Sequence, residues 1–447
     1  MSTTTAPRTS PLKVASASFI GTTIEYYDFF IYGTAAALVF PKLFFPNASP
    51  LLGALLSFAT FGVGFFARPV GGVVFGHFGD RVGRKKMLVI SLVGMGAATF
   101  FMGVLPGYAS IGVAAPILLT LLRILQGFCV GGEWGGATLM AVEHAPVGRR
   151  GFYGAFPQMG APAGTALATL AFLAVSKLPE TSFLSWGWRI PFLLSSALVI
   201  VGMVIRLTIG ESPEFVKVRE SSERVKLPAA VAFQKYWKEI LLVAGIYLSQ
   251  GVFAYICISY FVSYGTTVQH ISRPAALMGV FVAGVVAVAG YGFFGSLSDR
   301  IGRKTTYLIG AVAMVVVIGP ALALINTGNP WLFGLALVLV FGIAMAPAGG
   351  ATGSLFALMF GPEVRYTGVS IGYTISQICG SAFAPLIATA IYAATKSTTG
   401  LLWYLLAAGV ISVISVLLLP GPYGKKEAAK QLEYASAKRA TSKLTNA

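Results

Sequence analysis

The string GHFGDRVGRKK, residues 76–86, returns later in the chain as GSLSDRIGRKT, residues 295–305. Six positions agree, always 219 residues apart: Gly76, Asp80, Arg81, Gly83, Arg84 and Lys85 correspond to Gly295, Asp299, Arg300, Gly302, Arg303 and Lys304. A bias of cations towards one side of a membrane explains the basic residues, but not an aspartate and two glycines at matching offsets. The sequence therefore predicts a chain of two related halves.

The composition indicates that most of the chain lies in lipid. Hydrophobic residues make up 56% of its 447 residues, and the mean hydropathy is +0.79. Apolar runs of about 20 residues, the length that crosses a bilayer core as a helix, recur from end to end. Membrane strands need only about 10 residues of alternating polarity. We therefore expect an all-α protein with twelve transmembrane helices, near 15–39, 52–76, 87–105, 112–141, 152–176, 190–209, 239–263, 275–296, 306–325, 331–358, 368–394 and 400–419.

The basic residues predict the orientation. The termini and the even-numbered connections hold 24 of the 32 lysines and arginines, and the other side holds five. The positive-inside rule then places both termini in the cytoplasm. The predicted parts are a cytoplasmic N-terminus at 1–14, a six-helix bundle at 15–209, a cytoplasmic loop at 210–238, a second six-helix bundle at 239–419 and a cytoplasmic tail at 420–447.

Several function classes are excluded by what the sequence holds. The net charge is +17, but the basic residues are dispersed over short loops, so no nucleic-acid partner is expected. Cys129, Cys257 and Cys379 stand singly in apolar runs, which argues against a metal site or a disulfide framework. No nucleotide-binding GxxxxGK[ST] element and no catalytic motif occurs. We expect neither an enzyme nor a cofactor, and an ion gradient as the source of energy.

The repeated strings, together with RILQG at 123–127, resemble signature motifs of the major facilitator superfamily. More narrowly, the chain is similar to the metabolite:proton symporter family, and within it to shikimate permease-like and related metabolite carriers. The segments that carry this similarity are IEYYDFFIYGTAAALVFPKLFFP at 24–46, FATFGVGFFARPVGGVVFGHFGDRVGRKKM at 58–87, LQGFCVGGEWGGA at 125–137, SWGWRIPFLL at 185–194, ESPEF at 211–215 and EVRYTG at 363–368.

The resemblance implies a fold and a function. It implies two six-helix bundles related by pseudo-two-fold symmetry, in a monomer of the bacterial plasma (inner) membrane. It implies import of a small hydrophilic metabolite, shikimate-like, an oxo acid or a dicarboxylate, together with a proton, by alternating access. The repeated strings would be gating loops of this cycle. A proton-linked efflux antiporter, a facilitative uniporter and a membrane receptor that does not translocate stay open as alternatives.

Charged residues at membrane depth are the candidates for proton coupling, because each one costs about 2.5 to 3.5 kcal/mol unless it has a partner or a wet cavity. Glu25 and Asp28 share one face of the first helix, and adjacent carboxylates disfavour double ionisation. Arg123, implied by the resemblance to take part in coupling or substrate binding, and Glu133 lie in the fourth helix. The alternatives are purely structural pairing of the carboxylates and a static ion pair of Arg123.

The remaining membrane cations and the neutral polar residues complete the prediction. Arg68 and Arg206 lie near the inner ends of their helices and are expected to reach the interface, in a structural role. Hydrogen-bonding residues dominate the second half, and Gln158 and Gln377 occupy equivalent positions of the two repeats. Ordinary packing is the alternative for each tyrosine. The predicted substrate-binding residues are Arg123, Tyr32, Gln158, Tyr247, Gln250, Tyr255, Tyr373 and Gln377.

Overall fold

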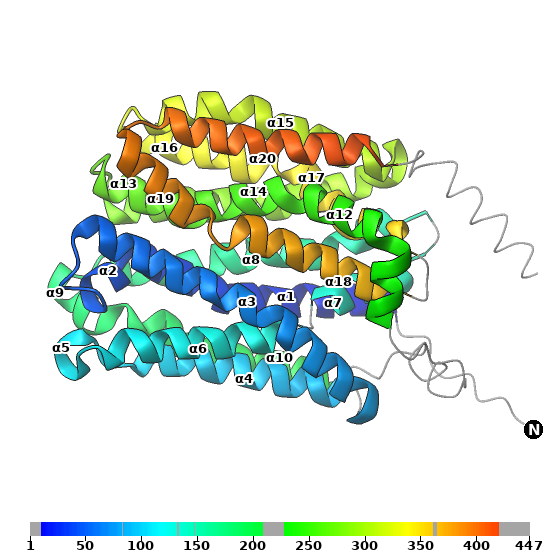
Figure 1. Ribbon diagram of the computed structural model, residues 1–447, viewed down its shortest axis with the longest axis horizontal. Coiled ribbons are helices and arrows are strands. Elements are labelled where there is room, and N and C mark those ends of the chain that lie inside the picture. Colours follow the sequence, from blue (N-terminus) through cyan, green and yellow to red (C-terminus); the bar gives the residue numbers. More distant parts are fainter. Residues whose placement is uncertain are drawn as a thin grey trace, which may run out of the picture.

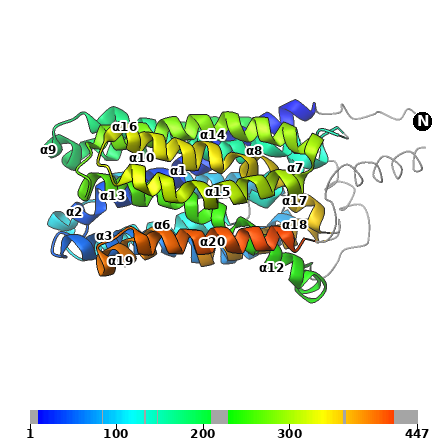
Figure 2. The same ribbon diagram turned by 90° about the horizontal axis from the view of Figure 1, so that it is seen from above.

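The structure is a computed structural model that describes residues 10–82, 84–131, 134–146, 148–208, 228–360 and 364–419. Figure 1 shows long helices that run side by side along one axis, and the described residues contain no strand. The start of α1 and the end of α20 lie at the same end of the molecule, which we call the terminal end (Figures 1 and 2).

The helical passes of the first half are α1 (Pro11–Leu38), α3 (Pro50–Val82), α4 (Arg84–Val104), α6 (Ala114–Val130) with α7 (Trp134–Glu143), α8 (Arg150–Ser176) and α10 (Arg189–Thr208). Those of the second half are α12 (Pro228–Tyr255) with η2 (Ile256–Tyr260) and α13 (Phe261–Thr267), α14 (Arg273–Ile301), α15 (Arg303–Ile325), α16 (Pro330–Leu337) with η3 (Val338–Ala344) and α17 (Ala346–Met359), α18 (Arg365–Ser376) with η4 (Gln377–Ser381) and α19 (Ala384–Thr395), and α20 (Thr399–Leu417). Short helices in the connections are α2 (Phe40–Leu43), α5 (Tyr108–Ile111), α9 (Glu180–Ser182) and η1 (Phe183–Gly187).

The helices agree with the expected membrane architecture. Within the described ranges, nine passes are long and apolar enough to cross a bilayer, and Val89–Val104 and Ala114–Val130 are shorter apolar helices. α1, which carries Glu25 and Asp28, completes the twelve passes. The largest difference from the expected boundaries is at α12, which begins at Pro228 rather than near residue 239. Its first residues include Gln234, Lys235 and Lys238, which a search for apolar runs passes over.

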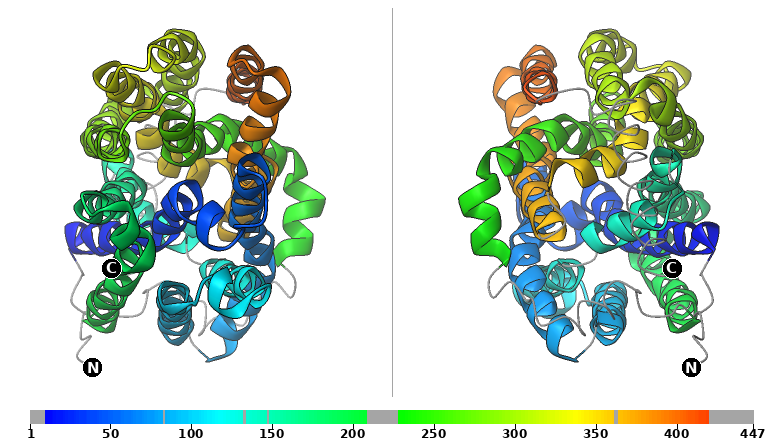
Figure 3. Two further views of the ribbon diagram at one scale, coloured as in Figure 1. Left: turned by 90° about the vertical axis from the view of Figure 1, so that its left-hand side faces the viewer. Right: turned by 90° about the vertical axis from the view of Figure 1, so that its right-hand side faces the viewer.

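The two halves lie side by side and meet along their inner helices. Figure 3, seen along the helices, separates the blue-to-teal first half from the green-to-red second half. α8 packs against α1 of its own half and against α14 of the other, while α3 packs against α19. The candidate site residues described below lie on these inner helices or pack behind them.

Candidate functional site

A small cavity lies between the two halves. Its volume is about 30 Å³, which is room for about two water molecules and less than a metabolite needs. Its wall comes from α1 and α8 of the first half and from α12, α14 and η3 of the second. The polar residues of the wall are Tyr26, Gln158, Thr165, Tyr247, Gln250, Tyr255 and Tyr291.

Neutral hydrogen-bonding groups continue behind the cavity wall. The Tyr26 and Tyr373 hydroxyls are 2.8 Å apart, and Gln377 Nε2 donates to the Tyr373 hydroxyl at 2.7 Å. Among the described residues, Gln158 Nε2, the Tyr255 hydroxyl and Gln377 Oε1 are buried without a hydrogen-bond partner. Buried polar atoms normally have partners, so these atoms are candidates to bind the polar groups of a guest molecule.

Gln158→Leu should weaken substrate binding without destabilising the protein, because the Gln158 amide nitrogen has no partner that the change would remove. One lost hydrogen bond of about 1 to 1.5 kcal/mol corresponds to a rise in KM of roughly tenfold. Gln250→Leu is the matched comparison, since Gln250 Oε1 accepts from Thr352 at 2.9 Å. It should lower the melting temperature, measured on purified protein. An unchanged KM in Gln158→Leu would remove Gln158 from the binding site.

A hydrogen-bonded chain of buried side chains joins Asp28 to Arg123. Thr99 Oγ1 of α4 lies 3.2 Å from Asp28 Oδ2 and 2.9 Å from the Met95 carbonyl oxygen. Gln126 Nε2 of α6 donates to Thr99 Oγ1 at 2.8 Å, and Arg123 Nη1 donates to Gln126 Oε1. Asp28, Thr99 and Arg123 are each fully buried. Three helices of the first half therefore connect a carboxylate to a guanidinium through two neutral groups.

The Arg123 guanidinium is enclosed by aromatic rings. Its central carbon lies 4.1 Å from the ring centroid of Phe29, 4.4 Å from that of Tyr32 and 4.7 Å from that of Phe61. Nε donates to the Phe61 carbonyl oxygen at 3.4 Å, and Nη2 is buried without a hydrogen-bond partner. In the part of the chain that the structure describes, Arg123 forms no ion pair. The alternative of a static pair with Glu25 or Asp28 is therefore not what this structure contains.

An aromatic partition separates Arg123 from the cavity. The Tyr255 ring lines the cavity and packs on Phe29, Phe61 and Phe65, with centroids 5.7, 5.4 and 5.6 Å away. Of the predicted substrate-binding residues, Gln158, Tyr247, Gln250 and Tyr255 line the cavity, and Tyr373 and Gln377 are hydrogen-bonded behind it. Arg123 and Tyr32 lie on the other side of the partition, where the Tyr32 hydroxyl donates to Thr60.

Arg68 lies in the interior and not at the membrane interface. Only 8% of it is exposed, and its guanidinium carbon lies 4.5 Å from the ring centroids of both Phe29 and Phe65. Its Nε has no hydrogen-bond partner within the ranges that the structure describes. The expectation that Arg68 reaches the membrane interface is wrong, because its side chain turns towards the aromatic partition. Arg68 and Arg123 therefore place two cations against the same Phe29 ring.

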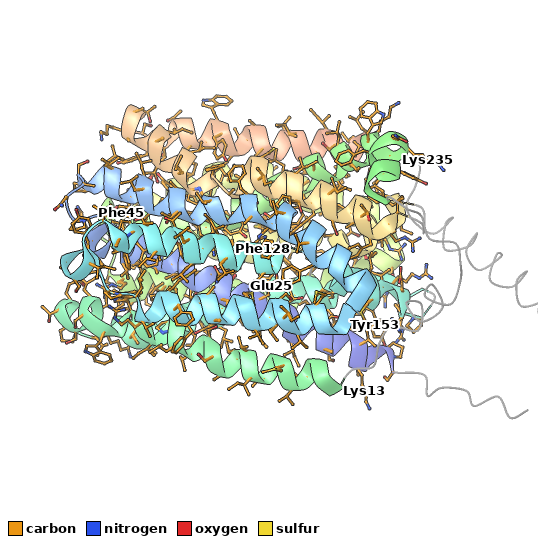
Figure 4. The ribbon with its side chains drawn as sticks, turned by 60° about the horizontal axis from the view of Figure 1, so that its bottom comes forward. Lys13, Glu25, Phe45, Phe128, Tyr153 and Lys235 are labelled. Atoms are coloured by element: carbon orange, nitrogen blue, oxygen red, sulfur yellow. The ribbon has the colours of Figure 1, made fainter. Side chains whose placement is uncertain are left out.

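The other predicted coupling residues differ in how far the structure describes them. Glu25 is 5% exposed and lies near the middle of the long axis, whereas Lys13 and Lys235 lie at the terminal end (Figure 4). Glu133 and Gly83 are outside the described residues, as are the side chains of Arg206 and of Gly76, Asp80, Arg81, Arg84 and Lys85.

The second of the repeated segments, residues 295–305, holds the two halves together at the terminal end. A Cβ on Gly151, at the start of α8, would lie 2.6 Å from the Gly295 carbonyl oxygen of α14, so only glycine permits this approach. The Asp299 carboxylate accepts from the amides of Gly151 at 2.7 Å and Phe152 at 3.0 Å. The carboxylate thus binds the positive end of a helix that belongs to the other half.

The rest of the second string shapes its turn and binds a neighbouring helix. Gly302 has φ +99°, which non-glycine residues rarely adopt, and it ends α14 before α15 begins. Arg303 pairs with Asp299 at 3.4 Å. Lys304 Nζ donates to the Leu417 and Leu419 carbonyl oxygens at the end of α20, at 3.2 and 2.7 Å. Arg300 is exposed.

Asp299→Ala should free the start of α8. A lost helix cap costs about 1 kcal/mol, which corresponds to roughly fivefold faster opening of the contact. The measurement is hydrogen–deuterium exchange of peptides that cover Gly151 and Phe152, with Arg300→Ala as the control on the same turn. Exchange as slow as in the unchanged protein would mean that Asp299 does not hold the two halves together.

Ion pairs join the halves at both ends. At the end opposite the termini, Glu180 of the first half binds Lys42 at 2.7 Å and also Arg273 of the second half. The Arg273 guanidinium lies 3.9 Å from the Phe183 ring centroid. At the terminal end, Arg365 lies 3.4 Å from Glu143. Together with the contact of Asp299 with the start of α8, these ion pairs describe a closed conformation. This agrees with the small volume of the cavity.

The comparison with protein families decides what kind of protein has this architecture. The family model of the Major Facilitator Superfamily matches residues 18–378 and 283–445. The chain belongs to the major facilitator superfamily. The chain is 41% identical over 421 residues to the inner membrane metabolite transport protein YhjE of Escherichia coli K12, covering 92% of this chain and 94% of that protein. It is 37% identical over 414 residues to the shikimate transporter of the same organism, covering 91% and 94%.

Solved structures of this superfamily share the fold. The chain superposes on the proton:xylose symporter XylE with a TM-score of 0.71, at 18% identity, covering 91% of this chain and 94% of that one. The partially occluded inward open conformation of XylE from E. coli gives a TM-score of 0.70 at 19% identity, covering 93% and 99%. As a superfamily member with metabolite-transporting relatives, this protein is a membrane transporter of metabolites and not an enzyme.

Proposed function

We propose that this superfamily member is a proton-coupled symporter that imports a small hydrophilic metabolite bearing a carboxylate. In this proposal the protein acts as a monomer in the bacterial inner membrane, with the terminal end in the cytoplasm, as the positive-inside bias of the sequence indicates. The two halves rock about the cavity between them, and the contacts of Asp299, Glu180 and Arg365 break and form again during the cycle.

The observation that carries the proposal is the buried chain from Asp28 through Thr99 and Gln126 to Arg123. The Thr99 hydroxyl has one hydrogen but two acceptors in reach, Asp28 Oδ2 and the Met95 carbonyl oxygen. When Asp28 is ionised, Thr99 donates to it. When Asp28 is protonated, Asp28 itself donates to Thr99, and Thr99 turns its hydrogen to Met95. The hydrogen bond between Asp28 and Thr99 can therefore persist in both protonation states, whereas Asp28 Oδ1 is buried without a hydrogen-bond partner among the described residues.

The row of hydrogen bonds from Asp28 to Arg123 also gives a proton a way to affect substrate binding. An ionised Asp28 stabilises the Arg123 charge through the aligned dipoles of Thr99 and Gln126, and protonation removes that stabilisation. A neutralised Asp28 leaves Arg123 as a buried cation with an unpartnered Nη2, which favours an anionic guest. The guest reaches Arg123 only when the Tyr255 or Phe29 ring moves, and the cavity must widen in any case. The substrate and the proton therefore favour the same rearranged state.

The test is uptake by proteoliposomes that contain the purified protein and carry an imposed inward proton gradient. The panel is shikimate, which a 37% identical relative is named for, several oxo acids and several dicarboxylates. We expect at least one of them to accumulate above its outside concentration, and a protonophore to abolish the accumulation. Uptake that only equilibrates indicates a uniporter. Accumulation driven by an outward gradient of protons indicates an antiporter, and saturable binding without uptake indicates a receptor.

A further inference from the structure

The start of α12 lies across the axis of the other helices. The backbone at Tyr236 is non-helical, with φ −123° and ψ 24°, and it divides α12 into a short first arm and the long pass. In Figure 3 the transmembrane helices are seen end-on, whereas the bright green first arm is seen from its side, at the edge of the bundle. Figure 1 places this arm at the terminal end, where the apolar helices end. It therefore lies at the depth of the membrane–water interface.

Some residues around this kink pack against the protein, and others are exposed. Ala232 and Ile240 are buried against the protein, and the Tyr236 ring packs on Phe360 with centroids 6.0 Å apart. Phe233 and Trp237 are 52% and 51% exposed. A soluble helix would bury such rings, but they suit the boundary of acyl chains and headgroups, where amphipathic tryptophan is enriched.

Two lysines stand beside the exposed rings. Lys235 and Lys238 are exposed, and Figure 4 shows Lys235 at the terminal end of the molecule. Their ammonium groups lie 5.6 Å from the rings of Tyr236 and Trp237, and neither forms an ion pair in the described part of the chain. Glu239, the next residue of α12, is half-buried, so residues 232–239 together carry one net positive charge. Exposed apolar rings beside basic residues form the pattern of a helix that lies in a membrane surface.

We propose that the segment 232–238, which holds the end of the first arm and the kink at Tyr236, lies in the membrane interface and binds the headgroups of anionic phospholipids through Lys235 and Lys238, while Phe233 and Trp237 enter the acyl-chain boundary. The charge of the lysines complements an anionic headgroup, and the short aromatic face fits the shallow depth of an interface. This segment lies at the start of the second half, so the lipid anchors the beginning of α12. The inference does not depend on which metabolite the protein carries or on proton coupling.

The experiment measures quenching of Trp237 by brominated lipids in the full-length protein reconstituted into nanodiscs. The signal of Trp237 is the difference between the unchanged protein and Trp237→Phe. One sample holds brominated phosphatidylglycerol in unbrominated phosphatidylcholine. In the other sample, the same mole fraction of brominated phosphatidylcholine takes the place of the brominated phosphatidylglycerol. We expect the anionic lipid to quench several-fold more strongly. Each lysine near an anionic surface contributes about fivefold in local lipid binding.

The control variants separate a specific site from general membrane charge. Lys235→Gln/Lys238→Gln should make the two lipids quench equally, whereas Lys177→Gln/Lys396→Gln, at the opposite end, should keep the preference for anionic lipid. Raising the salt concentration should reduce the preference in the unchanged protein, which tests the proposal even if a variant fails to fold. Equal quenching in the unchanged protein, or a preference that survives in Lys235→Gln/Lys238→Gln, would overturn the proposal. No quenching by either lipid would mean that protein covers this face, and it would overturn the proposal as well.

Discussion

Asp28→Asn is expected to abolish proton-driven accumulation while exchange of labelled for unlabelled substrate continues. An inward gradient of one pH unit supplies about 1.4 kcal/mol per proton and so supports an accumulation of about tenfold, whereas the variant should only equilibrate the substrate. The physical reason is that asparagine mimics a carboxyl group that never releases its proton, and its amide can still donate to Thr99. Both quantities are measured in the same proteoliposomes, with and without the imposed gradient.

Two further variants sharpen the Asp28 experiment. Glu239→Gln removes a half-buried carboxylate that lies outside this hydrogen-bonded chain, and it should keep proton-driven accumulation. Thr99→Val keeps Asp28 but breaks its link to Gln126, so accumulation should fall below that of the unchanged protein. If Asp28→Asn still accumulated substrate to the full extent, the proton would be carried elsewhere. Glu25 would then be the next residue to change.

Arg123→Gln is expected to reduce the rate of uptake by on the order of 100-fold, because breaking a buried charged network costs several kcal/mol. The change removes a guanidinium held by three rings, by the Phe61 carbonyl and by Gln126. It also leaves an ionised Asp28 without a linked cation. Initial rates of substrate uptake under an imposed proton gradient measure the loss.

The double variant Asp28→Asn/Arg123→Gln distinguishes a shared network from two separate roles. If the two residues act through one hydrogen-bonded chain, exchange in the double variant should be faster than in Arg123→Gln alone, because the change at Asp28 removes the ionised carboxylate that Arg123→Gln leaves without a linked cation. Effects that multiply would indicate that Asp28 and Arg123 act independently. Arg149→Gln, an exposed arginine before α8, is the control for loss of charge at the surface.

The membrane fold follows from the sequence because each signal is local. Apolar runs of the right length predicted the passes, and the repeated strings predicted the two halves of the superfamily fold. The repeated strings, which include Gly295 and Asp299, were predicted only as gating loops. Their partner, the start of α8 in the other half, comes from the tertiary structure. The first arm of α12 was missed because a search for apolar runs does not detect a short helix with lysines.

The polar site was predicted less completely, because burial and direction depend on packing between helices. Gln158, Tyr247, Gln250 and Tyr255 were predicted from polarity within apolar runs, and all four line the cavity. Thr99 was missed since a single threonine in an apolar helix carries no signal of its own. Arg68 was assigned to the interface from its depth along the helix alone. Its direction, onto the rings of Phe29 and Phe65, depends on how the helices pack.

The most direct test of the account measures protons and substrate together. Proteoliposomes with a pH-sensitive dye inside receive a transported carboxylate without any imposed gradient, and internal pH and labelled uptake are followed at once. Proton coupling through Asp28 predicts that protons enter with the substrate in the unchanged protein, and that Asp28→Asn, in liposomes that also hold unlabelled substrate, exchanges substrate with no change of internal pH. Substrate that enters the unchanged protein at full rate without proton movement would contradict it.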